Sequence, residues 1–132
     1  MTPAHAVPSG SLVRHQGREW LKAERDSKDY VNHYLVGVQA EPDLALLYID
    51  PDIELEILAL SVRPEGLVAR AEGQVPCCGD LLATETGRHF IKALDIKKDG
   101  QRHLAYVDVQ SGEIRPRQER GRLTVFAAWH LK

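Results

Sequence analysis

Hydrophobic and polar positions alternate with a period of two over much of this chain. Residues 49–57 are the clearest case, because an apolar or proline residue and a carboxylate follow one another there without a break. Successive side chains of an extended chain point to opposite faces. The pattern therefore predicts a β-strand with a buried apolar face and a solvent-facing acidic face. The acidic face would consist of Asp50, Asp52, Glu54 and Glu56.

Turn-forming residues recur roughly every ten positions, and the segments between them favour strands. Asp99-Gly100 predicts the clearest hairpin. Arg63-Pro64-Glu65-Gly66 predicts a further turn, and Asp50-Pro51-Asp52 carries turn residues within the acidic segment. The predicted strands are 34–40, 44–49, 53–62, 67–71, 89–96, 103–109 and 123–131.

Residues 19–40 are the one stretch that can also be drawn as an amphipathic helix. Its Val and Tyr content and Gly37 favour a strand over 30–40, while 18–25 is left open between helix and strand. Residues 1–10 contain two prolines and show no periodicity, which predicts a flexible N-terminal arm. A single β-rich domain is then expected over 11–132.

The predicted fold class is mainly β, an antiparallel meander that forms a small barrel or sandwich with at most one or two short helices. A β-rich α+β arrangement is the alternative. The 132 residues fit one domain, and 43% hydrophobic residues are enough for a folded core. No apolar run is long enough to span a bilayer, and the first residues do not form a secretory signal. We therefore expect a cytoplasmic protein that does not contact membranes.

Charge is unevenly distributed along the chain. Residues 1–87 hold 7 Lys and Arg against 14 Asp and Glu, whereas residues 88–132 hold 10 against 5. Two explanations remain open: a partner of one charge sign, or two halves that neutralise each other when folded.

Residues 115–122 carry four arginines, namely Arg115, Arg117, Arg120 and Arg122. With Phe126 and Trp129 nearby, this loop could contact phosphates while an aromatic ring stacks on a base. The net charge of −2 disfavours a nucleic acid as the partner. A loop that pairs with the acidic segment, within the molecule or across a dimer, fits the charges equally well.

No motif in the chain dictates catalysis. There is no nucleophile elbow and no phosphate-binding glycine loop, and Cys77-Cys78 lacks a second cysteine pair for a zinc site, so ordinary reduced thiols are expected. An acid–base pair of residues distant in sequence, such as His89 with Asp80, is the weakest alternative. We therefore predict neither a cofactor nor a metal site and favour a protein that is not an enzyme.

The leading hypothesis is a non-catalytic binding module that works through a charged surface. Its partner would be another protein or a second copy of the chain in a homo-oligomer, with the four acids and four arginines as contact residues. One alternative is a nucleic-acid-binding module that uses loop 115–122. The other is a barrel or sandwich that encloses a small apolar ligand. Its lining would be Trp20, Tyr30, Tyr34, Phe90, Tyr106, Phe126 and Trp129.

Overall fold

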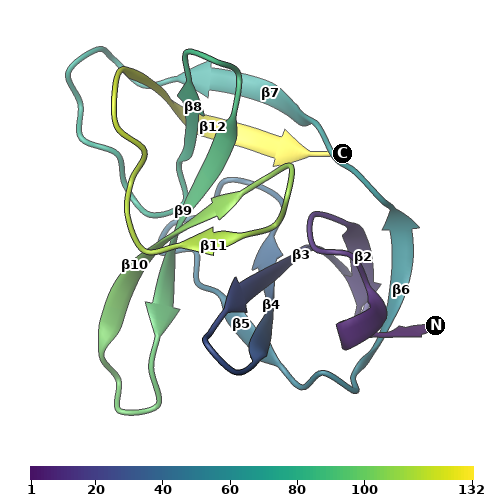
Figure 1. Cartoon of the computed structure of the whole chain (residues 1–132). Coiled ribbons are helices and arrows are strands. Elements are labelled where there is room, and N and C mark those ends of the chain that lie inside the picture. Colours follow the sequence, from purple (N-terminus) through teal and green to yellow (C-terminus); the bar gives the residue numbers. More distant parts are fainter.

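The computed structural model describes residues 1–132 and contains two antiparallel six-stranded sheets (Figure 1). The first sheet has the order β1-β6-β2-β3-β4-β5. Its strands are β1 (Thr2–Pro3), β2 (Leu12–His15), β3 (Arg18–Asp26), β4 (Val31–Gly37), β5 (Leu47–Ile49) and β6 (Glu54–Ala59). A 3-10 turn, η1 (Ala4–Ala6), is the only helical element.

The second sheet has the order β11-β10-β9-β8-β12-β7. Its strands are β7 (Pro64–Ala69), β8 (Leu81–Thr84), β9 (His89–Ile96), β10 (Arg102–Asp108), β11 (Ile114–Arg115) and β12 (Leu123–Leu131). The mainly β prediction is confirmed, and the architecture is sandwich-like rather than a closed barrel. The segment left open at 18–25 lies in strand β3, which pairs with β4 from Trp20 to Asp26.

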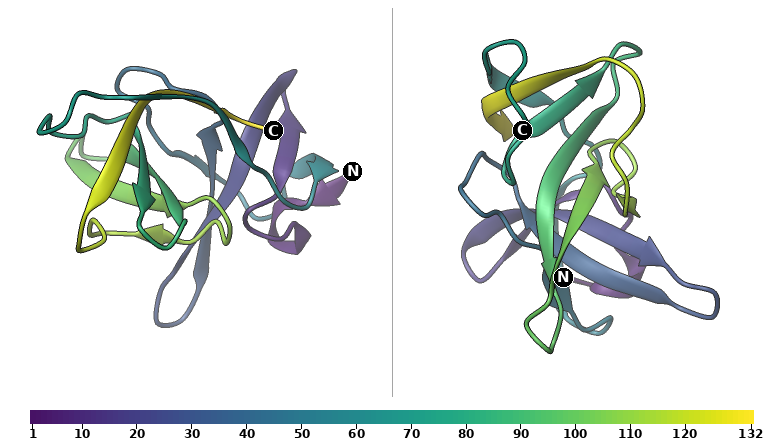
Figure 2. Two further views of the ribbon diagram at one scale, coloured as in Figure 1. Left: turned by 90° about the horizontal axis from the view of Figure 1, so that it is seen from above. Right: turned by 90° about the vertical axis from the view of Figure 1, so that its left-hand side faces the viewer.

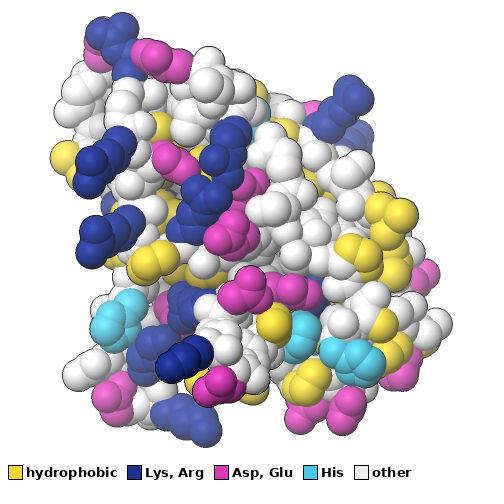
Figure 3. All heavy atoms as spheres, viewed as in Figure 1, with side chains coloured by type: hydrophobic (Ala, Val, Ile, Leu, Met, Phe, Trp, Pro, Cys, Tyr) yellow, Lys and Arg dark blue, Asp and Glu magenta, His cyan; other side chains and the backbone are white.

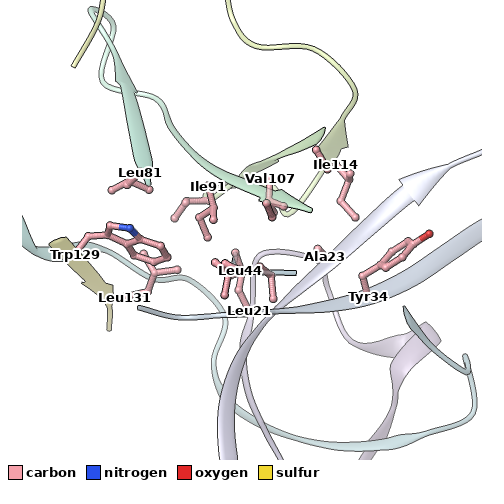
Figure 4. Close-up of a cluster of buried hydrophobic side chains, with 14 residues drawn as sticks. Leu21, Ala23, Tyr34, Leu44, Leu81, Ile91, Val107, Ile114, Trp129 and Leu131 are labelled. Atoms are coloured by element: carbon pink, nitrogen blue, oxygen red, sulfur yellow. The ribbon is translucent and has the colours of Figure 1, made fainter. Parts of the chain in front are cut away.

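The main core lies between the two sheets, whose strands cross at a steep angle (Figure 2). Alternation in β3 directs Leu21 and Ala23 into this core, where they face residues of the second sheet such as Ile91 and Val107 (Figure 4). Trp129 of β12 closes one end, and its indole Nε1 donates a hydrogen bond of 2.8 Å to the Gly79 carbonyl. The predicted alternation therefore builds the interface between the sheets.

A second, smaller core lies on the other face of the first sheet. Its fully or almost fully buried members are Ala4, Val7, Val13, Leu35, Ile49 and Leu55. The predicted flexible arm over 1–10 is wrong for this reason: Ala4 and Val7 fill the core, and β1 pairs with β6. The Ala4 amide also donates to the Ile53 carbonyl at 2.8 Å.

The acidic segment is interrupted by a turn, so the prediction of one strand over 49–57 needs correction. Strand β5 ends at Ile49 and β6 begins at Glu54. Between them the Asp52 amide donates to Asp50 Oδ1 at 2.9 Å, the local contact that makes aspartate a turn former. The predicted sidedness nevertheless holds, because all four acids are exposed while Leu55 is fully buried.

Prolines and glycines mark three further features. The turn predicted at 63–66 is wrong: Pro64 begins β7, an edge strand where a missing N–H group disturbs no inner ladder. The Asp99-Gly100 hairpin is confirmed between β9 and β10. The sheets also meet at Gly112, where a Cβ atom would lie only 2.7 Å from the Lys22 carbonyl oxygen of β3.

Candidate functional site

The predicted acidic and basic contact residues lie on different sheets and do not meet. Glu56 pairs with Arg14 at 3.3 Å, and Asp52 lies 3.9 Å from His5. No ion pair joins the four acids to the arginines of residues 115–122, which begin in β11 of the second sheet. Pairing of loop and acidic segment within one molecule is therefore wrong, and pairing across copies stays a prediction.

The arginine loop is held in place by its first member. Arg115 Nη1 lies 2.6 Å from Glu119 Oε1, and Arg115 Nη2 lies 3.4 Å from Glu113 Oε2. The Arg115 guanidinium also sits 5.5 Å from the ring centre of Phe90, which Arg88 approaches to 5.2 Å. Two cations thus cover one buried aromatic ring and fix the base of the loop.

Three adjoining surface hollows run along this loop. The largest, about 800 Å³, lies between the end of β3, the β9–β10 hairpin and β11. The second, about 420 Å³, shares Arg115 with it, and the third, about 200 Å³, shares Arg120 with the second. We call the basic residues that line them the arginine track: Arg25, Arg88, Lys97, Arg102, Arg115, Arg117, Arg120 and Arg122. Lys and Arg side chains gather on the left of Figure 3, over these elements.

Half of the track consists of unpaired guanidinium groups. The other half is neutralised in part: the buried Asp95 carboxylate lies 2.5 Å from Arg25 Nη1 and 2.8 Å from Lys97 Nζ. Burial alone would raise the pKa of Asp95, but the hydrogen bonds from Lys97 and Arg25 outweigh it and lower that pKa. Asp95 therefore stays ionised and anchors two track cations. The members without any carboxylate partner are Arg102, Arg117, Arg120 and Arg122, and all four are exposed.

Sequence reasoning found the loop but missed the rest of the track. Arg25, Arg88, Lys97 and Arg102 reach it only because β3, β9, β10 and β11 meet in space. The one linear signal was the Asp99-Gly100 hairpin, which places Lys97 and Arg102 near each other across its turn.

The two cysteines border a separate hollow of about 390 Å³. Arg70 binds Asp80 there through two hydrogen bonds of 2.6 and 3.0 Å, and the Cys77 amide donates to Asp80 at 2.8 Å. Burial raises the pKa of the Cys78 thiol, as does the nearby Asp43 carboxylate, although Lys92 opposes them. A thiol held protonated is a poor nucleophile.

The acid–base pair of His89 and Asp80 does not form. Both Asp80 oxygens accept hydrogen bonds from Arg70, and one of them also accepts from the Cys77 amide. His89 Nδ1 is buried without a hydrogen-bond partner, and burial lowers the pKa of the imidazole. The weakest of the functional alternatives is therefore not supported by the geometry.

The aromatic side chains do not line a common cavity. Tyr34 and Trp129 belong to the main core, Trp20 packs on the second core, and Phe90 and Tyr106 form a third cluster with Leu82. Tyr30 is 61% exposed. The sheets do not close into a barrel either, so the alternative of an enclosed apolar ligand finds no support in this geometry.

A buried ionisable cluster fastens the N-terminal segment to β3 and β4. The Lys22 side chain has no exposed area, and its Nζ lies 2.9 Å from Glu24 Oε1 and 3.0 Å from His33 Nδ1. It also donates to the Val7 carbonyl at 3.4 Å. Burial lowers the pKa of Lys22 against the pull of Glu24, and burial followed by the Lys22 charge lowers the pKa of His33. None of the hollows described above is lined by these groups.

No group of three or more His, Cys, Asp or Glu side chains gathers in a way that could hold a metal ion. The structure contains no helix of the length and apolarity needed to cross a membrane. Comparison of the chain with protein-family models, with curated proteins and with solved structures found no match.

Proposed function

We propose that this protein is a non-catalytic binding module that holds an anionic partner on the arginine track. The observation that carries the proposal is the run of adjoining hollows in which four exposed guanidinium groups have no carboxylate partner. Such a surface attracts anions from solution and speeds their association. The residues concerned are Arg102, Arg117, Arg120 and Arg122.

The distribution of ion pairs supports a partner rather than internal neutralisation. Residues 1–59, which form the first sheet, carry 5 basic and 10 acidic side chains, and residues 60–132 carry 12 and 9. Of the fourteen ion pairs, only Arg25–Asp95 joins the two sheets, and it uses a cation from the acidic half. The charge surplus of each half is therefore directed toward solvent.

Charge reversal on the track tests the proposal. Fluorescence anisotropy at low ionic strength would follow labelled polyglutamate, a heparin fragment and oligothymidylate. We expect wild-type protein to bind at least one of these polyanions and Arg117→Glu/Arg120→Glu to bind it about tenfold more weakly or worse, because two cationic contacts become repulsive.

The matched control is Arg63→Glu/Lys132→Glu, which changes net charge equally at two exposed residues outside the track. It should bind like wild type. Equal losses in both double variants, or no binding of any polyanion by wild type, would contradict the proposal.

A second copy of the chain is the anionic partner that the exposed acids Asp50, Asp52, Glu54 and Glu56 would provide. Sedimentation velocity at low and high salt distinguishes this case. If copies bind each other, wild type alone forms an assembly that dissociates in salt. Both Asp52→Lys/Glu54→Lys and Arg117→Glu/Arg120→Glu would then remain monomeric. A salt-insensitive monomer leaves an external polyanion as the partner.

A further inference from the structure

We infer that the anionic partner is a single-stranded nucleic acid whose phosphates lie along the arginine track and whose bases stack on Tyr48. This inference rests on the proposed function and adds the chemical class of the ligand. It draws on two observations independent of the unpaired arginines: the polarity of the hollows and the position of one exposed aromatic ring.

The lining of the track suits a phosphate chain better than a protein. Leu104 and Ile114 are the only hydrophobic residues that line the largest hollow, and the other two hollows have none. Protein interfaces place aromatic and aliphatic anchors at their centre, and no aromatic side chain lines any of the three hollows. A sugar–phosphate backbone needs cations and hydrogen-bond donors, and the planar guanidinium group matches phosphate with two parallel hydrogen bonds.

Tyr48 is connected to the largest hollow through Tyr34. It is 59% exposed, and its ring centre is 5.6 Å from that of Tyr34 in an edge-to-face arrangement. The Arg25 guanidinium, which lines the hollow, is 5.6 Å from the same Tyr34 ring. The residue before β5, the strand that contains Tyr48, is also hydrogen-bonded to β9. The Leu46 amide donates to the Leu94 carbonyl at 2.8 Å, and Leu94 directly precedes Asp95.

An exposed ring beside a row of cations is the combination that proteins use to bind unpaired nucleotides. The ring stacks on any base, while the cations follow the backbone and make the affinity depend on salt. Stacking on Tyr48 requires a base face that is free, which single strands have and duplexes do not. Seven of the eight track cations lie in residues 60–132, where 12 basic side chains outnumber 9 acidic ones despite the net charge of −2 for the whole chain.

The experiment separates stacking from charge. Two labelled polymers of equal length are compared, oligothymidylate and an abasic deoxyribose-phosphate chain. We expect wild type to bind oligothymidylate more tightly. Tyr48→Ala should weaken oligothymidylate binding about five- to a hundredfold while leaving the abasic chain unaffected, because only the bases stack. Tyr48→Phe should restore binding. Arg102→Glu should weaken both polymers, because it removes a backbone contact.

Tyr48 also packs on Tyr34, so a second variant protects the test against a loss of folding. Tyr48→Leu keeps bulk at this position and should show the same selective loss as Tyr48→Ala. Wild-type affinity in Tyr48→Leu would overturn the stacking role, and tighter binding of a duplex than of its separated strands would overturn the single-strand assignment. Binding of polyglutamate but of neither polymer would refute the nucleic acid and leave the proposed function intact.

Discussion

Among single residues, Gly112 shows how closely the two sheets approach. Its φ angle of +73° belongs to the left-handed region, which side chains with a Cβ rarely adopt. A Cβ atom there would also lie 2.7 Å from the Lys22 carbonyl oxygen and would overlap the Gly10 nitrogen. Both conditions, the backbone angle and the close contact, require glycine at this position.

We expect Gly112→Ala to lower the free energy of unfolding by about 3 kcal/mol or more, because backbone strain and overpacking add. Gly73→Ala is the control, since Gly73 has a similar φ angle of +85° but a Cβ atom there would have no neighbour within 4 Å. It should cost only about 1 kcal/mol, from the backbone angle alone. Urea denaturation of both variants measures the difference, and equal losses would show that the close approach costs nothing.

His33 makes stability depend on pH through its position against Lys22. The groups that face it are Lys22 and Glu24 on β3 and His5 in η1. Burial and then the Lys22 charge hold the pKa of His33 below its unfolded value of 6.5. The folded state therefore binds this proton less readily than the unfolded state. Its contribution is fully present above the unfolded pKa and is lost as pH falls through the folded pKa.

His33→Gln should flatten this dependence between about pH 7 and pH 5. The amide oxygen of glutamine can still accept a hydrogen bond from Lys22, but it does not titrate. The lost contribution is at most about 1.4 kcal/mol per pH unit, the value for one proton. The buried His89, whose pKa is also lowered, will leave part of the dependence in place. His103→Gln, at an exposed position, is the control for urea midpoints measured across this range. An unchanged slope in His33→Gln would contradict the argument.

Among the elements, the N-terminal segment differs most from its expectation. Two prolines and weak periodicity suggested an arm, yet Val7 is 2% exposed and its carbonyl accepts a hydrogen bond from buried Lys22. Short segments of small residues carry little periodic signal, because one or two buried side chains do not make a pattern. Pairing of β1 with β6 also holds this segment in place, and the residues of β6 lie some fifty positions later in the chain.

Val7→Ala should therefore destabilise the protein by about 2 kcal/mol, since it removes two buried methyl groups and leaves a cavity. Val75→Ala makes the same change at a residue that is 77% exposed and should stay within about 0.5 kcal/mol of wild type. Thermal or urea unfolding measures both. If Val7→Ala leaves the free energy of unfolding unchanged, this segment does not stay packed in solution.

Long strands with regular alternation were predictable from the sequence, and short ones were not. The predictions at 89–96, 103–109 and 123–131 agree with β9, β10 and β12 within one residue. Strands β1, β2, β8 and β11 contain two to four residues and were missed, because so few positions cannot show a period of two. At Asp50-Pro51-Asp52 the turn residues prevailed over an unbroken alternation.

For the whole molecule, the candidate site could be predicted only where its residues lie close together in the sequence. Residues 115–122 contain four arginines, which is enough to mark this segment as basic in the sequence alone. Arg25 and Arg102 are ordinary strand residues until β3 and β10 come together around β11. The buried Lys22 had no sequence signal at all, because an isolated lysine in a strand is normally solvent-exposed.

Strand order in the second sheet has a consequence for biosynthesis. Strand β7 has a single neighbour, β12, which follows it by more than fifty residues in the chain. On its other side β12 pairs with β8. The first sheet, by contrast, draws all six strands from residues 2–59. During translation the nascent chain therefore carries β7 with both of its edges unpaired until β12 emerges and pairs with it.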